Sequence, residues 1–402
     1  MCALTIQQVV GLVKTICKDN SVIDRLEKDL NKSAVFKALP KTPISAILLA
    51  RILNENVQEI PSTMTDLYAK YMELVLGRWD MQKGLQSQIE YDVINNVVIN
   101  IAIFSLENNV GEVPLGDVFA IYESYVSSRK FNIDTQLLYS RLLENKEVFY
   151  HNRVKGVLAF RHRTFAEYFY AQGMVRDNSA VIDMKTYELY WSSSYFFYFG
   201  LKRDCPQLIK ALDSIESHDE RFMFLKLLNH GQFLLAAYLT PYEDIARSLS
   251  KAFKDASFFH SDLVDLNIES PLQQLSKLQI TMLTSRLLSM AYGYDFFLDA
   301  IKEEALNVYS TPCKSDEDMQ LLFFLNTVLI FSDEVDAYDY MLKEYPNTIP
   351  LILQTAMLEN TSDNKKLTLL LEKLSKKLYK SAKKNPSMQK ALIDLYDKPL
   401  KG

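Results

Sequence analysis

Apolar residues recur at spacings of three and four along almost the whole chain, a pattern that is typical of amphipathic helices. In the first 80 residues this spacing predicts helices at about 5–18, 21–31, 43–55 and 63–78. Pro40, Pro43 and Pro61 mark helix starts, because proline is tolerated in a first helical turn. We interpret residues 1–80 as a small helical domain and the polar stretch 82–88 as a linker.

A different pattern begins at residue 89. Apolar spacing predicts helices at 89–106, 117–128 and 134–145, with a loop at 111–116. Two short stretches of alternating character follow, at 147–151 and 156–161, and predict a β-hairpin turning through 152–155. Helical spacing resumes at 164–174. Three helices followed by a hairpin indicate a winged-helix domain, which we place at 89–175.

From residue 178 to residue 402 one amphipathic helix follows another. The breaks between them contain Pro206, Pro241, Pro271, Pro312, Pro346 and Pro386. Several breaks lie roughly 30 to 45 residues apart, the spacing of helix pairs stacked as a solenoid of the TPR or HEAT kind. The predicted fold class is mainly α, with a helical domain, a winged helix that carries a short β-hairpin, and an α-solenoid.

Composition supports this interpretation and narrows the setting. The chain has 402 residues, of which 48% are hydrophobic and only 11 are glycine, so it can bury two or three helical cores. Its four cysteines form no C-x-x-C pair, the N-terminus lacks the pattern of a signal peptide, and we expect no run long enough to span a bilayer. These features predict a cytoplasmic protein. A net charge of -5 favours neither nucleic acid nor anionic membranes as partners.

The segment 160–169, FRHRTFAEYF, carries the strongest candidate chemistry. His162 lies where the predicted hairpin ends and a helix begins. Backbone N–H groups and the helix dipole favour an anion at such a position. On the residues alone, a histidine that only caps the local helix is the preferred alternative. Arg161 and Arg163 flank His162, but strand alternation would send them to the opposite face, so we leave them out of the site.

This segment resembles F-x-H-x-T-F-x-E-[YF]-[LF], found near the end of the winged-helix domain in NACHT-type STAND NTPases. That class contains animal Nod-like receptors and many bacterial antiphage sensors. Upstream, the stretches 42–53 and 59–71 are similar to the helical domain that follows a NACHT core, and the order of the blocks agrees with the family. The resemblance implies that His162 contacts the β-phosphate of bound ADP and that Pro43 packs on the adenine.

The sequence has no G-x-x-x-x-G-K-[ST] run, which a P-loop needs to cradle phosphates. The stretch 327–334 resembles a Walker B strand, because apolar residues lead to the acidic pair Asp333 and Glu334. Its apolar spacing continues toward residue 342, however, and predicts a core helix. We therefore expect the protein to begin after the catalytic core and not to be an enzyme by itself. ADP or ATP would bind only together with a NACHT core supplied in cis or in trans. No histidine has metal-ligand spacing.

The resemblance implies the regulatory and sensory portion of a NACHT/STAND signalling ATPase, which closes over ADP and gates oligomerisation in bacterial antiviral defence or another stress response. The array at 178–402 would bind a protein or peptide trigger. The alternative function is a stand-alone winged-helix and helical-repeat adaptor that binds protein or DNA. Its recognition helix would be 134–145, which offers only Arg141 and Lys146 as basic residues against the acidic Asp134 and Glu144, so DNA is the weaker partner. A purely structural scaffold is a third alternative.

Two further segments have two interpretations each. The aromatic residues between 187 and 199 are either a stacking platform for a ligand or a packed core, and we favour the core. The lysines of 365–384 alternate with leucines and are either a footprint for nucleic acid or lipid headgroups, or the solvated outer face of a terminal helix. We favour the solvated face, because the last repeat of a solenoid needs a polar outside.

Overall fold

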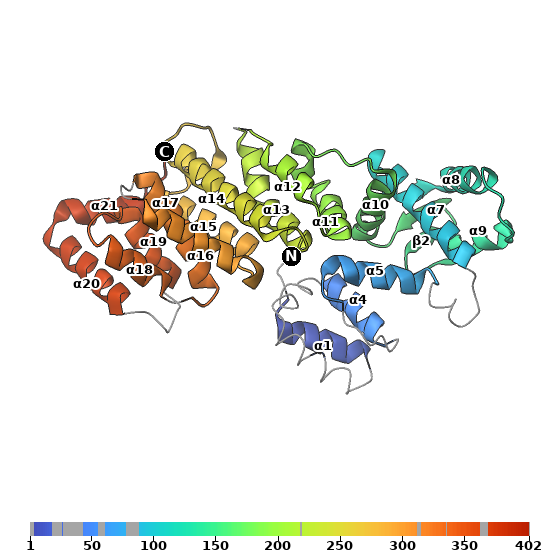
Figure 1. The fold of residues 1–402 in the computed structure, drawn as a ribbon, viewed down its shortest axis with the longest axis horizontal. Coiled ribbons are helices and arrows are strands. Elements are labelled where there is room, and N and C mark those ends of the chain that lie inside the picture. The colour runs from blue at the N-terminus through green and yellow to red at the C-terminus, as the bar shows by residue number, and fades with distance from the viewer. Residues whose placement is uncertain are drawn as a thin grey trace. The chain divides into compact units, whose positions relative to one another are not determined.

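The structure is a computed structural model that describes residues 4–17, 26, 43–54, 61–77, 88–217, 219–311, 315–334, 336–361 and 369–401. The protein divides into two compact units, Met1–Cys205 with Ala236–Leu239, and Pro206–Leu235 with Thr240–Gly402 (Figure 1). Most of the predicted helix at 21–31 and of the predicted linker at 82–88 lies outside the described residues.

The first unit is mainly helical. Its elements are α1 (Ile6–Ile16), α4 (Pro43–Asn54), α5 (Met64–Val75), α7 (Gln88–Glu107), β1 (Val113–Pro114), α8 (Leu115–Ser127), α9 (Thr135–Glu144), β2 (Phe149–Asn152), β3 (Val157–Phe160), α10 (Arg163–Asp177), the 3-10 helix η1 (Met184–Tyr187) and α11 (Ser192–Lys202). The predicted helices at 5–18, 43–55, 63–78, 89–106, 117–128 and 134–145 are confirmed to within three residues at each end. Local signals explain several boundaries: the Thr63 side chain, for example, accepts a hydrogen bond from the Asp66 N–H at the start of α5.

The predicted hairpin is confirmed, and the sheet contains one strand more than predicted. β2 and β3 pair antiparallel, with Phe149 opposite Phe160. The prediction of a loop at 111–116 was wrong, because Val113 and Pro114 form β1, which pairs with β3 and gives the order β1–β3–β2. A two-residue strand is too short to show an alternating pattern, so periodicity could not reveal it.

Helix α10 occupies the core of the first unit, packed between α7 and α11. Gly173 lets α7 approach closely, since a Cβ there would lie 2.8 Å from the Ile103 Cδ1 atom. On the α11 side, the Phe197 ring lies 5.5 Å from that of Tyr168 and 4.8 Å from that of Tyr68 on α5. Tyr187, Phe197 and Phe199 are buried, which confirms the packed-core interpretation of the aromatic run for these residues.

One helix in the described part of the protein, α7, is long and apolar enough to span a bilayer. The expectation that no run reaches that length was therefore wrong. Half of its most apolar window is buried inside the protein, and its residues pack against α10. A buried core helix passes the same test of length and composition, so the finding assigns no membrane.

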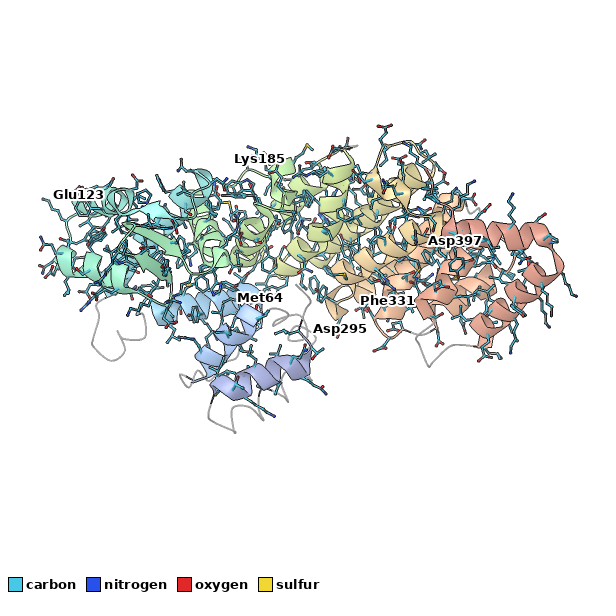
Figure 2. The ribbon with its side chains drawn as sticks, turned by 180° about the vertical axis from the view of Figure 1, so that it is seen from behind. Met64, Glu123, Lys185, Asp295, Phe331 and Asp397 are labelled. Carbon is cyan, nitrogen blue, oxygen red and sulfur yellow. The ribbon has the colours of Figure 1, made fainter. Side chains whose placement is uncertain are left out.

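The second unit is built from α12 (Pro206–Asp213), α13 (Glu220–Ala236), α14 (Tyr242–Val264), the 3-10 helix η2 (Pro271–Gln274), α15 (Lys277–Tyr292), α16 (Asp295–Ser310), α17 (Asp316–Phe331), α18 (Ala337–Glu344), α19 (Leu351–Thr361), α20 (Leu369–Lys384) and α21 (Pro386–Asp397). The mainly α fold class is confirmed. Side chains fill the spaces between these helices, and Figure 2 labels Asp295 at the start of α16 and Phe331 at the end of α17.

Helix α17 is the centre of this unit, in contact with α14, α15, α16, α18 and α19. It is buried on almost every side, and its buried polar groups are paired: the hydroxyl groups of Thr327 and Tyr338 lie 2.6 Å apart, and Asn360 Nδ2 donates to the Tyr338 hydroxyl at 3.0 Å. The stretch 327–334 that resembles a Walker B strand is thus part of a core helix, as predicted. The helix ends at Phe331, however, and does not continue toward residue 342, because a turn follows and Tyr338 and Met341 belong to the separate helix α18.

Candidate functional site

His162 is the N-cap residue of α10, at the junction that the sequence predicts. Strand β3 ends at Phe160, and the Arg161 N–H still bonds the carbonyl of Val148 before the backbone turns into the helix. The His162 backbone is extended, with φ -134° and ψ 136°, and its side chain makes no capping hydrogen bond. The exposed imidazole is therefore available to a ligand instead of being used as a side-chain cap.

The electrostatic surroundings of His162 keep it neutral near pH 7. Its ring meets Phe165 edge-on, with the ring centroids 5.3 Å apart. Partial burial, and then the charge of Arg161, lower the pKa of His162 below its ordinary value. A neutral imidazole keeps one N–H donor and one acceptor. At the start of a 15-residue helix with no acidic residue in its first turn, that donor adds to the free N–H groups of the backbone.

The two arginines that flank His162 have different surroundings. Arg163 is held in place: its Nε atom lies 2.7 Å from Glu167 Oε1, its Nη2 atom donates to the Tyr190 carbonyl, and its guanidinium lies 4.0 Å from the centre of the Tyr190 ring. Burial raises the pKa of the Glu167 carboxyl, and the hydrogen bond from Arg163 opposes that rise. Arg163 therefore serves packing.

Arg161 lies beyond the end of β3. Its positive charge lowers the pKa of His162 and also acts on the Tyr71 hydroxyl of α5. Arg161 is thus electrostatically close to both groups, and it is exposed. We expected strand alternation to place Arg161 on the face opposite His162. That argument does not apply, because β3 ends at Phe160, one residue before Arg161.

A polar network connects α5 to the start of α10 and to α4. The Tyr68 hydroxyl donates to Thr164 Oγ1 at 3.1 Å, two residues beyond His162. Burial raises the pKa of Tyr68 to about 12, so its hydroxyl keeps its proton. The Tyr71 hydroxyl donates to Glu147 Oε2 at 3.2 Å, and the same oxygen lies 2.6 Å from Arg51 Nη1 on α4.

Pro43, the second predicted site residue, is the first residue of α4 and is partly buried. Arg51 lies in the last turn of the same helix, about 12 Å further along its axis at 1.5 Å per residue. The contact network beside His162 therefore reaches the far end of α4 and does not include Pro43. Sequence reasoning missed Arg51, Glu147 and Tyr71, because their contacts join residues that are far apart in the sequence.

Within the described residues no group of three or more His, Cys, Asp or Glu side chains is arranged to hold a metal ion. The His162 region offers N–H donors and cationic side chains, which suit an anionic ligand.

A comparison with known families bears on the other end of the protein. Residues 232–402 match the family described as NACHT C-terminal helical domain 1. The match supports assigning residues 232–402 to the C-terminal part of a NACHT-type protein. This match lies wholly outside the segments 42–71 and 160–169, so it supports the NACHT resemblance independently of them. A NACHT C-terminal domain implies a NACHT core in the same protein. No curated protein and no solved structure matched the sequence.

Proposed function

We propose that this NACHT-type protein is the regulatory and sensory portion of a STAND signalling ATPase. Its first unit closes over ADP held by a P-loop core, and its second unit gates oligomerisation when a trigger binds, in a defence or stress response. Such a switch requires that nucleotide and trigger prefer different conformations of the protein. The family match at 232–402 supports the NACHT part of the proposal.

The winged-helix assignment is part of the same proposal. Residues 88–160 run in the order α7, β1, α8, α9, β2, β3, with the sheet order β1–β3–β2. The winged-helix assignment requires this order of elements: one helix, a short strand, two helices and then a two-stranded wing. The successive helices of the second unit are in turn consistent with a helical-repeat array.

The observation that carries the nucleotide proposal is the exposed His162 at the N-terminus of α10. Phosphate is an anion that such a terminus favours by about 0.3–1 kcal/mol at an exposed site. A hydrogen bond from His162 to a charged phosphate oxygen would add about 1.5–3 kcal/mol. Arg161 adds positive charge nearby, since that charge already acts on His162.

The alternative of a DNA-binding adaptor is weaker on one observation. In α9, the helix that would read bases, Arg141 Nη1 lies 3.6 Å from Glu90 Oε2 on α7. A basic side chain that is already paired within the protein contributes less to a phosphate or base contact. We therefore keep nucleotide regulation as the proposed function.

The test uses the protein expressed together with its NACHT core. A fluorescent ADP analogue is loaded, and its dissociation is followed after excess unlabelled ADP is added. We expect His162→Ala to raise the dissociation rate about tenfold to a hundredfold, since it removes one hydrogen bond to phosphate. The matched control is Arg153→Ala in the exposed hairpin turn, which should release ADP at the wild-type rate.

The proposal fails if His162→Ala retains ADP as well as the wild type does. It also fails if the protein without a NACHT core binds ADP as tightly as the protein with one. The core would then contribute nothing to ADP binding, whereas the proposal makes His162 one contact in a site that the core completes. Pro43→Ala is measured in the same way, and faster release would place Pro43 at the adenine.

A further inference from the structure

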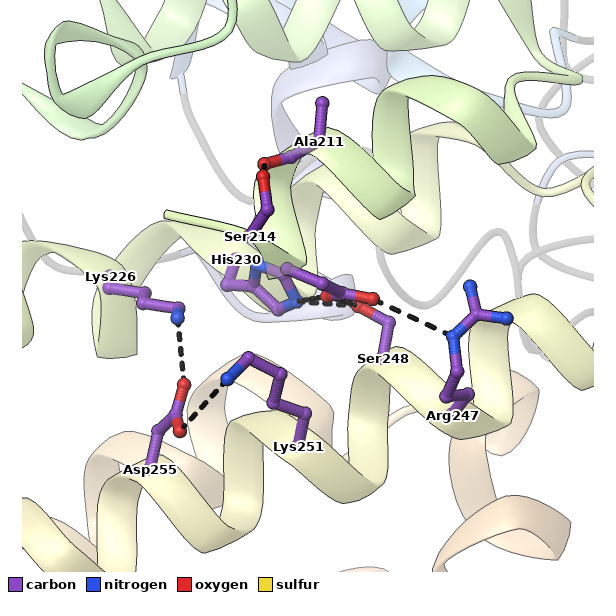
Figure 3. Close-up of polar contacts among 9 residues, drawn as sticks. Ala211, Ser214, Lys226, His230, Arg247, Ser248, Lys251 and Asp255 are labelled. Carbon is purple, nitrogen blue, oxygen red and sulfur yellow. Dashed lines mark hydrogen bonds and ion pairs between the residues drawn. The ribbon is translucent and has the colours of Figure 1, made fainter. Parts of the chain in front are cut away.

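The second unit contains a cleft of about 320 Å³ between α13, α14 and the segment 215–217. That volume is at the lower end of the range for small-ligand sites. Its main lining residues are Met223 and Lys226 from α13, and Lys251, Asp255, Phe258 and Phe259 from α14. Figure 3 shows three of these side chains, Lys226, Lys251 and Asp255, pointing toward one another.

Two lysines and one aspartate meet in the cleft, so this cluster has one more positive than negative charge. Lys226 is only 5% exposed, and its Nζ atom lies 2.7 Å from Asp255 Oδ2. Lys251 Nζ approaches the other oxygen of the same carboxylate at 3.7 Å. Two ammonium groups thus share one carboxylate. An ammonium has three donors, and the described hydrogen bonds of Lys226 use one of them.

A buried ammonium with unused donors is costly, which makes Lys226 unusual in a protein interior. The adjoining cavity of about 10 Å³, lined in part by Lys226 and His230, has room for one water at most. His230, which also lines this small cavity, carries no negative charge and so does not neutralise Lys226. It is buried and its hydrogen bond goes to the Ser248 hydroxyl at 2.9 Å, while Ser248 donates to Asp213 at 2.5 Å. This series of contacts ties α12, α13 and α14 together.

The cleft is also lined by apolar side chains and by two further carboxylates. Phe258, which lines the same cleft, is 61% exposed, whereas Phe259 is almost fully buried. Glu216 and Asp262 also line the cleft. Their carboxylates repel a polyanion such as nucleic acid and can accept hydrogen bonds from peptide N–H groups. The ligand that complements this arrangement carries a single anionic group next to an apolar group.

We propose that this cleft binds a protein segment that presents a carboxylate beside an apolar side chain. The carboxylate lies between Lys226 and Lys251, and the apolar side chain packs on Phe258. The carboxylate is either the C-terminal carboxylate of the partner or an Asp or Glu side chain. This inference goes beyond the nucleotide proposal and does not depend on it, because no residue of the His162 region takes part.

The test titrates the protein with three small probes, followed by ligand-observed NMR. They are N-acetylphenylalanine, its neutral amide, and N-acetyl-aspartyl-phenylalaninamide. We expect the acidic probes to bind with a Kd on the order of 1 mM, as suits ligands of this size. The neutral amide should bind at least about tenfold more weakly. Tighter binding of N-acetylphenylalanine indicates that the partner presents a C-terminal carboxylate. Tighter binding of N-acetyl-aspartyl-phenylalaninamide indicates that it presents an acidic side chain.

Variants locate the binding. Lys251→Ala and Phe258→Ala change partly exposed side chains, so the fold should persist, and each should weaken the acidic probes about fivefold or more. Lys343→Ala on α18 and Phe331→Ala at the end of α17 are matched exposed controls outside the cleft and should bind like the wild type. Circular dichroism checks folding. The inference is overturned if no probe binds, if the neutral amide binds equally well, or if the controls weaken binding as much as the cleft variants.

Discussion

Acid should weaken the second unit through its two buried histidines. Burial lowers the pKa of His230 to about 3, and the neighbouring charges of Lys226 and Lys251 act in the same direction. Burial likewise lowers the pKa of His260 to about 4. The carboxyl of Asp213, 3.9 Å from His230, has its own pKa raised by burial. Both imidazoles are therefore neutral in the folded protein at pH 7.

The direction of this pH dependence follows from the linkage between proton binding and folding. In the unfolded state, a histidine takes up a proton below its ordinary pKa of about 6.5, whereas these folded sites do not until the pH approaches 3 or 4. Their contribution to stability is therefore complete above pH 6.5 and is lost as the pH falls toward those values. At pH 5 each histidine lowers the free energy of unfolding by about 2 kcal/mol relative to neutral pH. The raised pKa of Asp213 has the opposite effect, because it favours the folded state as the pH falls. The wild type alone therefore does not isolate the contribution of the histidines, and the assay compares it with a variant.

The variant is His230→Gln, which can still hydrogen-bond to Ser248 but does not titrate. Urea unfolding is measured at pH 7.5 and pH 5.0, with pulsed hydrogen–deuterium exchange on peptides from α13 and α14 as the readout for this unit. We expect the variant to lose about 2 kcal/mol less than the wild type between these pH values, about a thirtyfold difference in the unfolding constant. His151→Gln in the first unit is the control. Equal losses in wild type and variant would refute the reasoning.

Three other changes test packing and contacts. Gly200→Ala would place a Cβ 2.0 Å from Thr65 Oγ1 and should destabilise the first unit by about 1–3 kcal/mol in thermal unfolding, whereas Gly11→Ala, with nothing within 4 Å, should stabilise it by about 0.5–1 kcal/mol. Tyr338→Phe removes a buried hydroxyl with two hydrogen-bond partners and should lower the stability of the second unit by about 1–3 kcal/mol, so an unchanged urea midpoint would argue against that network. Glu147→Gln weakens the link to α4, and hydrogen exchange in α4 should quicken while α13 is unchanged.

The sequence predicted best where a local pattern was long. The change from alternation to helical spacing located the position of His162. Helical spacing also identified 327–331 as part of a helix and not a Walker B strand, although the apolar residues beyond 331 belong to a second helix. Local patterns failed where partners are remote: Arg51 and Glu147 are 96 residues apart, and neither signals the other. Lys226 and Asp255 face each other only because α13 and α14 pack side by side, which periodicity does not specify.

The NACHT resemblance rests on short motifs at 42–71 and 160–169, and the independent match lies at 232–402, where no motif was recognised. That segment is built from amphipathic helices, whose sequence pattern is a spacing of apolar positions and not a set of particular residues, so a search for short motifs finds little in it. The roles of His162 and Pro43 remain predictions, because a nucleotide contact depends on a ligand and on a core that a local pattern does not contain.

The two residues of β1 have a consequence for how this protein can assemble. In the order β1–β3–β2 that strand is at the edge of the sheet, where an open row of backbone groups would invite a strand from another molecule. Pro114 has no N–H to offer, and a two-residue strand gives an added strand little to pair with. Growth of the sheet from this edge is therefore disfavoured, and an added strand could pair only with β2, the longer strand at the opposite edge.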